Sequence, residues 1–573
     1  MNRLRNIAFC LFLGTFAISI AAQERSNNEI LNAASQVLGG GFAQNRAANA
    51  GDARSLNIDW RNEHLAFVSR QNGGFALIAT NKSAEAIVAY SENGTNFQQP
   101  ALQAYIKAAS TALAKLNGKS YAPYVPKGDF AKNIAPLLKT YWDQGTPYNN
   151  LCPLNAQGRP YPTGCVSTAL SQIMRYHSYP TQGQGVKEYS FKADDRVGDV
   201  IRVDFGSTTY DWDNMLPIHD QNCTEAQNKA VATLMFHAGV SVDMTYTSTG
   251  SGAYPTAARE GLITYFSYNP NIEYAERQFY STEEWMRMVY VELNASRPIL
   301  YGGSDKGYGG HAFVIDGYDN RGNVHVNWGW GEDGGNGFYD IALLDPEGLE
   351  FSETQHLLLG VTPQTIGEFR SHFVSLSNFT AKRLTNKMLT VSKDYRMYND
   401  TGESLSGEVG VILEPVIIKS GTYVANGEKS VLQTYSFTDA PDLFYFDDNV
   451  GGTITLPSDL SAGTYRLYVA VKSTRDNDWR PVRRTYGLTN SYLMTKTNKD
   501  FSLTEQTDDL WDSILLTRIE SVTPDTNNGQ TQVFDAAGRL IHSCPTARFN
   551  INDVKAKGVI IINDGKGMRK VLK

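Results

Sequence analysis

Apolar positions recur with helical spacing in the segment YPTGCVSTALSQIMRYHSYP, residues 161–180. From Val166 they fall at positions 166, 169, 170, 173, 174 and 177, which share one helix face, and Pro180 ends the run. The pattern predicts a helix over 165–178 with Cys165 in its first turn. Backbone N–H groups are unpaired there and the macrodipole is positive, so we expect a stabilised thiolate and a lowered pKa. Cys165 is either a nucleophile or a small buried hydrophobe.

The first part of the chain predicts a small α+β unit. Residues 57–70 and 73–97 read as strands with turns, and a helix follows that carries Leu102, Ile106, Ala109, Leu113 and Leu116 on one face. Residues 23–45 are polar and small. The unit ends in GKSYAPYVPKGD, residues 118–129, whose Gly, Pro and Lys content predicts an exposed linker that is easily cut.

The following regions differ in pattern. Residues 130–362 predict further helices near 225–238 and 282–294, and then strands at 312–319, 323–330 and 337–343, which make a second α+β unit. From 363 to about 520 the alternation of apolar and polar residues predicts one β-sandwich. The last segment predicts small strands separated by Gly and Asn turns, and it is too small to be an independent enzyme.

Length and charge narrow the classes of function. At 573 residues we expect three to five structural units. The net charge of −7 and pI near 5.8 provide no basic field for nucleic acid or an anionic membrane. Arg3 and Arg5 precede an uncharged run from Ile7 to Ala22 that ends in small residues, as in a secretory signal. This run is shorter than the roughly 20 residues that a membrane span needs, so we expect a cleaved signal over 1–22 and an exported protein.

Cysteine is scarce for an exported protein. Cys10 leaves with the signal, and four cysteines remain, Cys152, Cys165, Cys223 and Cys544. Each remaining thiol is therefore buried, paired once or chemically active. A Cys152–Cys223 disulfide is a pairing that the sequence leaves open.

A thiol nucleophile needs a base, an orienting partner for that base and donors for the oxyanion. His311 follows Gly309 and Gly310 at the start of an apolar strand, 146 residues after Cys165. Asn327 lies sixteen positions later on what we expect to be the neighbouring strand, beside His311, and Trp328 and Trp330 follow it. The papain-type arrangement places His and Asn about 130–150 residues after the cysteine, and Asn327 falls slightly beyond this window. Taken singly, the histidine could be structural and the asparagine a turn former.

Two further residues bear on the chemistry. His177 shares the helix of Cys165 but lies about 18 Å along its axis at ~1.5 Å per residue, so it is a poor base for that thiol. Gln144 stands in a loop rich in Pro and Gly that is suited to line a cleft, where its side chain can join the Cys165 N–H as an oxyanion donor.

Several motifs then resemble the streptopain family of papain-clan cysteine peptidases, which includes the interpains. They stand in family order over about 130–362: WDQGTPYN (142–149), TGCVSTALSQIMRYHSYP (163–180), YDWDNMLP (210–217), GVSVDMTY (239–246), GGHAFVIDGYD (309–319) and VHVNWGWG (324–331). The resemblance implies Cys165 as nucleophile, His311 as base, Gln144 as oxyanion-hole glutamine, and Asn327 with Trp328 as the pair that orients and shields the histidine. It implies no metal and no cofactor.

The resemblance extends to both ends of the chain. Residues 73–94 resemble the family's inhibitory prosegment, which implies a secreted zymogen whose prosegment keeps the histidine out of position until a cut within 118–140. VFDAAGRLI and KGVIIINDGKGMRKVLK resemble the C-terminal sorting domain of type IX secretion. This likeness implies a Gram-negative bacterium, contact with its secretion machinery, and a secreted or surface-associated product. Cys544 and its neighbours are not typical of that domain.

Together these expectations describe a multidomain protein. Its expected parts are a signal peptide (1–22), an α+β inhibitory propeptide (23–130), a papain-like α+β peptidase domain (131–362), a β-sandwich (363–525) and a small all-β sorting domain (526–573). The resemblance implies protein and peptide substrates, broad endopeptidase cleavage with an apolar P2 residue, and the prosegment as intramolecular inhibitor. Substrate contacts are expected from Ser251 and Gly252 in the loop STGSGAYPT, from Gly310 and from Trp330. The alternatives are another thiol acyl-transferase or amidase, and an inactive surface adhesin on a peptidase scaffold.

Overall fold

The computed structural model describes residues 24–572 except for short stretches. These are 39–54, 95–97, 118, 194–198, 306–308, 345–354, 367, 393–394, 420–421, 442–444, 448–450, 485–487, 490, 507–529, 536–539, 546–558 and 564–567. The expected signal peptide, residues 1–22, lies outside the described residues. Among the residues that are described, no helix is both long enough and apolar enough to cross a membrane.

Six α-helices are described: α1 (Asn27–Leu38), α2 (Pro100–Lys115), α3 (Cys165–His177), α4 (Glu225–Ser241), α5 (Pro255–Phe266) and α6 (Thr282–Asn294). Short 3-10 turns follow at η2 (Trp212–Asn214), η3 (Arg277–Phe279) and η4 (Ala342–Leu344). The predicted helices at 102–116, 165–178, 225–238 and 282–294 are confirmed. The helix α1 falls in the polar stretch 23–45, for which we predicted no helix or strand, and α5 begins directly after the loop 247–254.

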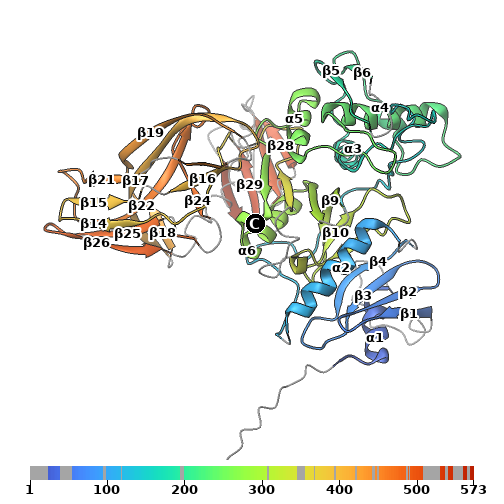
Figure 1. Ribbon diagram of the computed structural model, residues 1–573, viewed down its shortest axis with the longest axis horizontal. Helices are drawn as coiled ribbons and strands as arrows, with labels where there is room; N and C mark the ends of the chain where they lie inside the picture. The colour runs from blue at the N-terminus through green and yellow to red at the C-terminus, as the bar shows by residue number, and fades with distance from the viewer. Residues whose placement is uncertain are drawn as a thin grey trace, which may run out of the picture.

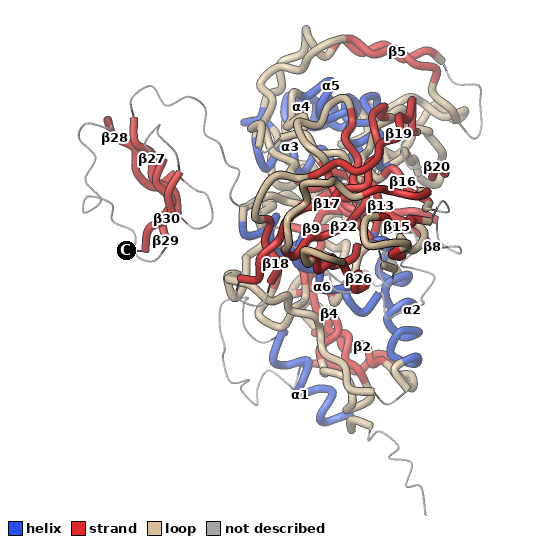
Figure 2. Tube along the Cα trace, turned by 90° about the vertical axis from the view of Figure 1, so that its left-hand side faces the viewer, coloured by secondary structure: helices blue, strands red, loops and turns tan. Residues whose placement is uncertain are grey.

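A ten-stranded sheet runs through the first two units (Figure 1). Its strands, in spatial order, are β1 (Leu56–Arg61), β2 (Leu65–Arg70), β3 (Phe75–Ala79), β4 (Ile87–Ser91), β11 (Gly337–Tyr339), β10 (Val324–Asn327), β9 (Gly309–Tyr318), β8 (Ile299–Asp305), β12 (His356–Leu359) and β7 (Glu273–Glu276). A separate hairpin is formed by β5 (Val186–Ser190) and β6 (Val200–Asp204). Figure 2 shows α3, α4 and α5 gathered at one end of the molecule and α1 and α2 at the other.

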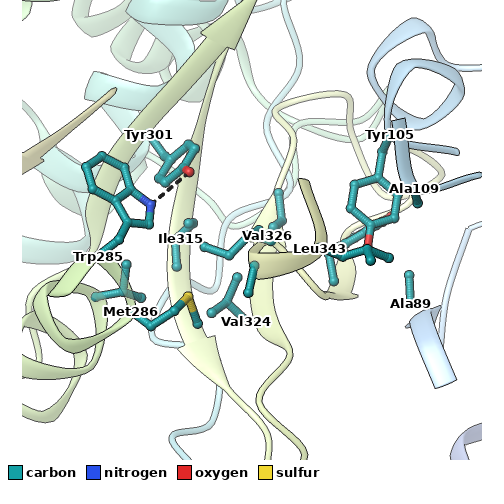
Figure 3. Close-up of a cluster of buried hydrophobic side chains, with 14 of the residues drawn as sticks. Ala89, Tyr105, Ala109, Trp285, Met286, Tyr301, Ile315, Val324, Val326 and Leu343 are labelled. Carbon is teal, nitrogen blue, oxygen red and sulfur yellow. Dashed lines mark hydrogen bonds between the residues drawn. The ribbon is translucent and has the colours of Figure 1, made fainter. Parts of the chain in front are cut away.

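The sheet joins residues 24–117, the N-terminal unit, to the residues that follow. Strand β4 pairs antiparallel with β11, with Tyr90 opposite Phe338 and Ala89 opposite Tyr339. One buried apolar cluster also spans both units, and Figure 3 shows Ala89, Tyr105 and Ala109 beside Leu343. The sequence pattern suggested a boundary near residue 130, whereas the sheet and this core are continuous across it.

The face of strand β9 is decided by the alternation of its side chains. Phe313 and Ile315 belong to the core shared with the N-terminal unit, while Ala312 and Val314 belong to a second core against helix α3. Successive side chains of a strand point to opposite faces, so His311 shares its face with Phe313. The strand therefore presents its histidine toward the shared core.

The C-terminal β region, residues 368–506, forms three sheets. The first sheet contains β20 (Tyr445–Asp447), β16 (Arg396–Asn399), β13 (Phe373–Ser375) and β24 (Arg483–Arg484). The second contains β14 (Ala381–Arg383), β15 (Met388–Val391) and β21 (Gly452–Thr455). The third contains β18 (Thr422–Ala425), β17 (Leu405–Lys419), β22 (Gly463–Ser473), β25 (Ser491–Lys496), β26 (Phe501–Gln506), β19 (Ser430–Ala440) and β23 (Arg480–Pro481). A last antiparallel sheet contains β28 (Leu540–Pro545), β27 (Gln530–Asp535), β29 (Val559–Asn563) and β30 (Met568–Leu572).

Polar contacts dock the C-terminal β region on the edge of the ten-stranded sheet. His372 lies 2.8 Å from the carboxylate of Glu273 on β7, and Tyr398 donates to Glu276 over 3.0 Å. Arg483 pairs with the buried Glu284 at 2.6 Å. Separating these parts would leave a buried charge without its partner, which is costly in free energy. We therefore expect the C-terminal β region to stay bound to the part that carries β7 and α6 when the chain is cut in the linker near residue 130.

The pairing of Cys152 with Cys223 does not form. Both cysteines are free, and burial raises the pKa of the Cys152 thiol to about 12. Cys152 packs within the core behind helix α3, while Cys223 is half-buried in the turn before α4. Cys152 is thus a small core residue in the described structure.

Candidate active site

Helix α3 begins at Cys165, as predicted from the spacing of its apolar residues. Gly164 precedes it with φ of +88°, and a Cβ atom there would lie 2.7 Å from the sulfur of Met244. Only glycine accommodates this backbone and this close approach without strain. The glycine turn therefore delivers Cys165 to the open end of the helix, with no side-chain cap on the first N–H groups.

The Cys165 thiol does not have the lowered pKa that we expected. Burial raises its pKa, and hydrogen bonding from the backbone of Ala312, Val166 and Cys165 itself opposes the rise. The helix start thus acts in the expected direction but is outweighed by lost solvation. In this state the sulfur lies beside the backbone of Ala312, the residue after His311, as a neutral thiol.

The His311 ring is held by aromatic neighbours. It stacks on Trp330 with ring centroids 5.3 Å apart and planes inclined by 12°, and its Nε2 lies 2.9 Å from the Trp328 carbonyl oxygen. Because a carbonyl can only accept, Nε2 carries the proton. Burial lowers the pKa of His311 to about 4, although the bond to Trp328 opposes this. The ring is neutral near pH 7 and, among the described residues, bonds only to this carbonyl.

A chain of hydrogen bonds connects the N-terminal unit to this histidine. Ser91 on β4 donates its hydroxyl to the carbonyl of Asn336 over 2.6 Å. The Asn336 side chain in turn accepts the backbone N–H of Trp328 over 2.8 Å, and the Trp328 carbonyl accepts His311. The position of His311 is therefore coupled to the docking of strand β4.

Asn327 lies on the strand next to β9, as predicted, but not beside His311, and the two side chains do not bond in this state. Strand β10 pairs with β9 so that Asn327 lies opposite Val314, and its side chain is buried. Its Oδ1 accepts from Gln172 over 3.1 Å and from the Gly329 N–H over 3.1 Å. The neighbouring strand was predicted, but the side chain turns toward helix α3.

Gln144 lies beside the start of helix α3. Its backbone carbonyl accepts the N–H of Thr163 over 3.0 Å, two residues before Cys165, and the residue is only 5% exposed. Its Nε2 has no hydrogen-bond partner among the described residues. An unpaired buried donor costs free energy, so it is an atom for which a ligand oxygen is the natural partner.

The expected substrate-contact residues take different positions. Gly310 and Gly252 are exposed, and a Cβ at Gly252 would meet nothing within 4 Å. Ser251 is buried and donates to the Pro162 carbonyl over 2.8 Å, so it ties the loop 247–254 to the residues before Cys165. Trp330 is half-buried under the His311 ring.

Sequence reasoning missed Gln172 and Asn336. Gln172 is a polar residue on the apolar face of helix α3, seven positions and two turns after Cys165, and this spacing could have singled it out. Asn336 stands in a glycine-rich turn, where the sequence offers no comparable signal.

A family model for the peptidase C10 family matches residues 142–339. The chain is 28% identical over 494 residues to the thiol protease/hemagglutinin PrtT of Porphyromonas gingivalis, a match that covers 79% of this chain. It spans 54% of the length of that relative.

Two further relatives match a larger share of their own length. Streptopain of Streptococcus pyogenes is 29% identical over 361 residues, which covers 56% of this chain and 89% of streptopain. A solved prointerpain A fragment of Prevotella intermedia is 38% identical, with a TM-score of 0.50, and the match covers 54% of this chain and 99% of the fragment.

Proposed function

The chain belongs to the streptopain and interpain family of cysteine peptidases, and on that premise we propose that it is the secreted zymogen of a cysteine endopeptidase. The observation that carries the proposal is that a thiol at a helix start lies against the strand that bears His311, with Gln144 bonded to Thr163 just before that helix.

In the proposed reaction, His311 takes the proton of Cys165 and the thiolate attacks a peptide carbonyl. The Cys165 N–H and Gln144 Nε2 hold the oxyanion, and the imidazolium protonates the leaving amine. Water then releases the acyl group from the sulfur. Before this reaction can begin, the His311 ring has to break its hydrogen bond to the Trp328 carbonyl and turn toward the Cys165 thiol. We propose broad specificity with an apolar P2 residue.

We assign the N-terminal unit, together with the residues that follow it up to Tyr121, as the inhibitory prosegment. It shares a sheet and a core with the central residues, and Ser91 is the first member of the hydrogen-bond chain that ends at His311. Removal of the prosegment would take away the support of this chain and release the ring. The precursor is then inactive because the Cys165 thiol and the His311 imidazole are both neutral, whereas the reaction needs them as a thiolate–imidazolium ion pair.

The cut that separates the prosegment is proposed within 122–133. Residues 127–129 and 131–133 are exposed and belong to no helix or strand. From Ile134 onward the chain is tied to β9, because Ile134 and Tyr318 exchange two backbone hydrogen bonds of 2.9 and 3.0 Å. This narrows the expected range of 118–140. The C-terminal β region contacts β7, at the other end of the ten-stranded sheet, and would remain bound there after this cut.

Alkylation of Cys165 tests the proposal. At about pH 6 we expect iodoacetamide to label Cys165 in the processed protein roughly 100-fold faster than in the precursor. Only a thiolate reacts, and we expect the imidazolium of a released His311 to keep Cys165 ionised at that pH in the processed protein alone. Mass spectrometry of the labelled peptide measures both rates. The half-buried Cys223 serves as the control, with equal labelling in both forms.

The same samples distinguish the other candidate functions. Casein hydrolysis by the processed protein supports the endopeptidase, whereas turnover of only peptidoglycan or glutamine donors would support an amidase or acyl-transferase. A processed protein that neither labels at Cys165 nor hydrolyses casein would support the adhesin. We further propose that the sheet of β27–β30 serves export through the secretion machinery to the cell surface.

Two buried carboxyl groups make the prosegment contact sensitive to pH. The hydroxyl of Tyr121 donates to Asp340 over 2.8 Å, and Tyr90 donates to Asp319 over 3.1 Å. Burial raises the pKa of Asp340 from 3.8 to about 7, although the hydrogen bond from Tyr121 opposes the rise. Burial also raises the pKa of Asp319, where backbone N–H groups, the Arg321 charge and the hydrogen bond from Tyr90 oppose the rise. The Tyr105 hydroxyl donates to the backbone carbonyl of Asp340 over 3.1 Å. We expect desolvation under the docked prosegment to outweigh the hydrogen bonds from Tyr121 and Tyr90, so that docking favours protonated carboxyl groups.

We expect a cut prosegment to dissociate more readily as pH rises. Protonated carboxyls favour the complex, so its affinity is full below about pH 4 and falls by up to about tenfold per pH unit toward pH 7. The Cys165→Ala precursor, cut in the linker by an added protease, is suited to this measurement by size-exclusion chromatography. Asp340→Asn is the matched control, and its prosegment affinity should depend less on pH. A prosegment that stays bound more tightly at high pH than at low pH would contradict the role given to the two carboxyl groups.

A further inference from the structure

We propose that Gln172 is a positioning residue of the peptidase, one that fixes the amide of Asn327 relative to the helix of Cys165. The inference rests on the proposed function. Gln172 is fully buried on helix α3, seven residues after Cys165, so both side chains lie on the same side of the helix.

The amide of Gln172 has a single orientation. Its Oε1 accepts the hydroxyl of Thr140 over 2.8 Å and the backbone N–H of Trp142 over 3.4 Å. Its Nε2 donates to Oδ1 of Asn327 over 3.1 Å. A flipped amide would set its NH₂ group against the Trp142 N–H and its oxygen against the amide oxygen of Asn327, and would lose these two bonds, whereas the Thr140 hydroxyl could turn to accept.

Asn327 is fixed by the same set of bonds. Its Nδ2 donates to the Thr140 carbonyl over 2.8 Å, while its Oδ1 accepts from Gln172 and from the Gly329 N–H. Thr140 thus bonds to both amides, through its hydroxyl and its carbonyl, and the three residues form a closed ring of hydrogen bonds.

The ring joins the three parts that the proposed reaction needs. Helix α3 carries Cys165, strand β10 carries Asn327, and the segment of Thr140 and Trp142 leads into Gln144. A released His311 ring would need an acceptor for its N–H, and Gln172 keeps the oxygen of Asn327 at a fixed distance from the nucleophile helix. Small misplacements of such groups reduce the rate of reaction strongly.

The Gln172→Glu variant gives the sharpest test. A neutral carboxyl group has one accepting oxygen and one O–H donor, the same pattern as the amide, whereas the ionised group has no donor and repels the oxygen of Asn327. Thr140, Trp142 and Asn327 carry no titratable side chain at these contacts. We expect kcat of the processed variant to fall about 10- to 100-fold near pH 8, as for other supporting contacts. KM should stay within about twofold, because this contact does not touch substrate.

Recovery at low pH separates positioning from packing. Between about pH 8 and pH 5 the ratio of variant to wild-type kcat should rise at least about fivefold as the carboxyl group becomes protonated. Ser171→Ala is the matched control: Ser171 is an adjacent, fully buried polar residue on the same helix, and its Oγ has no hydrogen-bond partner among the described residues. This control should keep wild-type kcat at every pH.

The outcomes are distinct. Parallel pH profiles for variant and wild type, or an unchanged kcat in a folded variant, would overturn the positioning role. If Gln172→Glu does not fold, Thr140→Val deletes one hydroxyl of the ring and should lower kcat about threefold to tenfold with unchanged KM; no loss there would also overturn it. An inactive wild-type protein would instead refute the proposed function.

Discussion

Replacing Cys165 with alanine is expected to abolish peptide hydrolysis and also maturation of the precursor, because we propose that the peptidase cuts its own linker. The thiol supplies the bond-forming electron pair in the proposed reaction, and no neighbouring group can substitute for it. Removing the nucleophile of a comparable acyl-transfer peptidase lowers kcat by roughly 10⁶. Purified precursor, wild type beside Cys165→Ala, is incubated and its N-terminal sequence is read over time, with casein hydrolysis assayed in parallel.

Cys223→Ala is the matched control for this experiment. Cys223 is free and half-buried, and its sulfur has only weak contacts of 3.8 Å with Ile218 and Asp220. This variant should mature and hydrolyse casein like wild type. A Cys165→Ala precursor that matures alone at the wild-type rate would contradict self-processing, and one that hydrolyses casein would contradict the nucleophile assignment.

Replacing Gln144 with alanine is expected to lower kcat about 10²- to 10³-fold with little change in KM. One oxyanion donor contributes roughly 3–4 kcal/mol in comparable enzymes, and this contribution is made in the transition state. Because Gln144 Nε2 has no partner among the described residues, losing this donor leaves no acceptor of the resting protein unpaired. We therefore expect the melting temperature to stay close to that of wild type.

The exposed Asn150 lies in the same loop and provides the control. Asn150→Ala should keep wild-type kcat and KM, since its side chain faces solvent. Steady-state kinetics on a peptide substrate measure both variants after processing. A Gln144→Ala enzyme whose KM rises while kcat is unchanged would assign the residue to substrate binding in general and would contradict an oxyanion role.

Local pattern predicted much of the candidate site. The helix over Cys165–His177, its glycine start and the strands of His311 and Asn327 follow from spacing and from turn residues within a few positions. The missed helix α1 and the missed role of Gln172 have a common cause. A short polar segment or a buried amide gains its stability from partners that are distant in sequence, such as strand β3 or Thr140.

The sequence by itself determined which residues form helices and strands, and that a cysteine stands at the mouth of a helix, because these depend on periodicity and on backbone preferences of neighbouring residues. Only the tertiary structure decided that the N-terminal unit continues the central sheet, that Cys152 and Cys223 stay free, and that burial raises the pKa of Cys165. It also decided that His311 bonds to the Trp328 carbonyl. Burial and side-chain partners are set by segments far apart in the chain, so no local pattern encodes them.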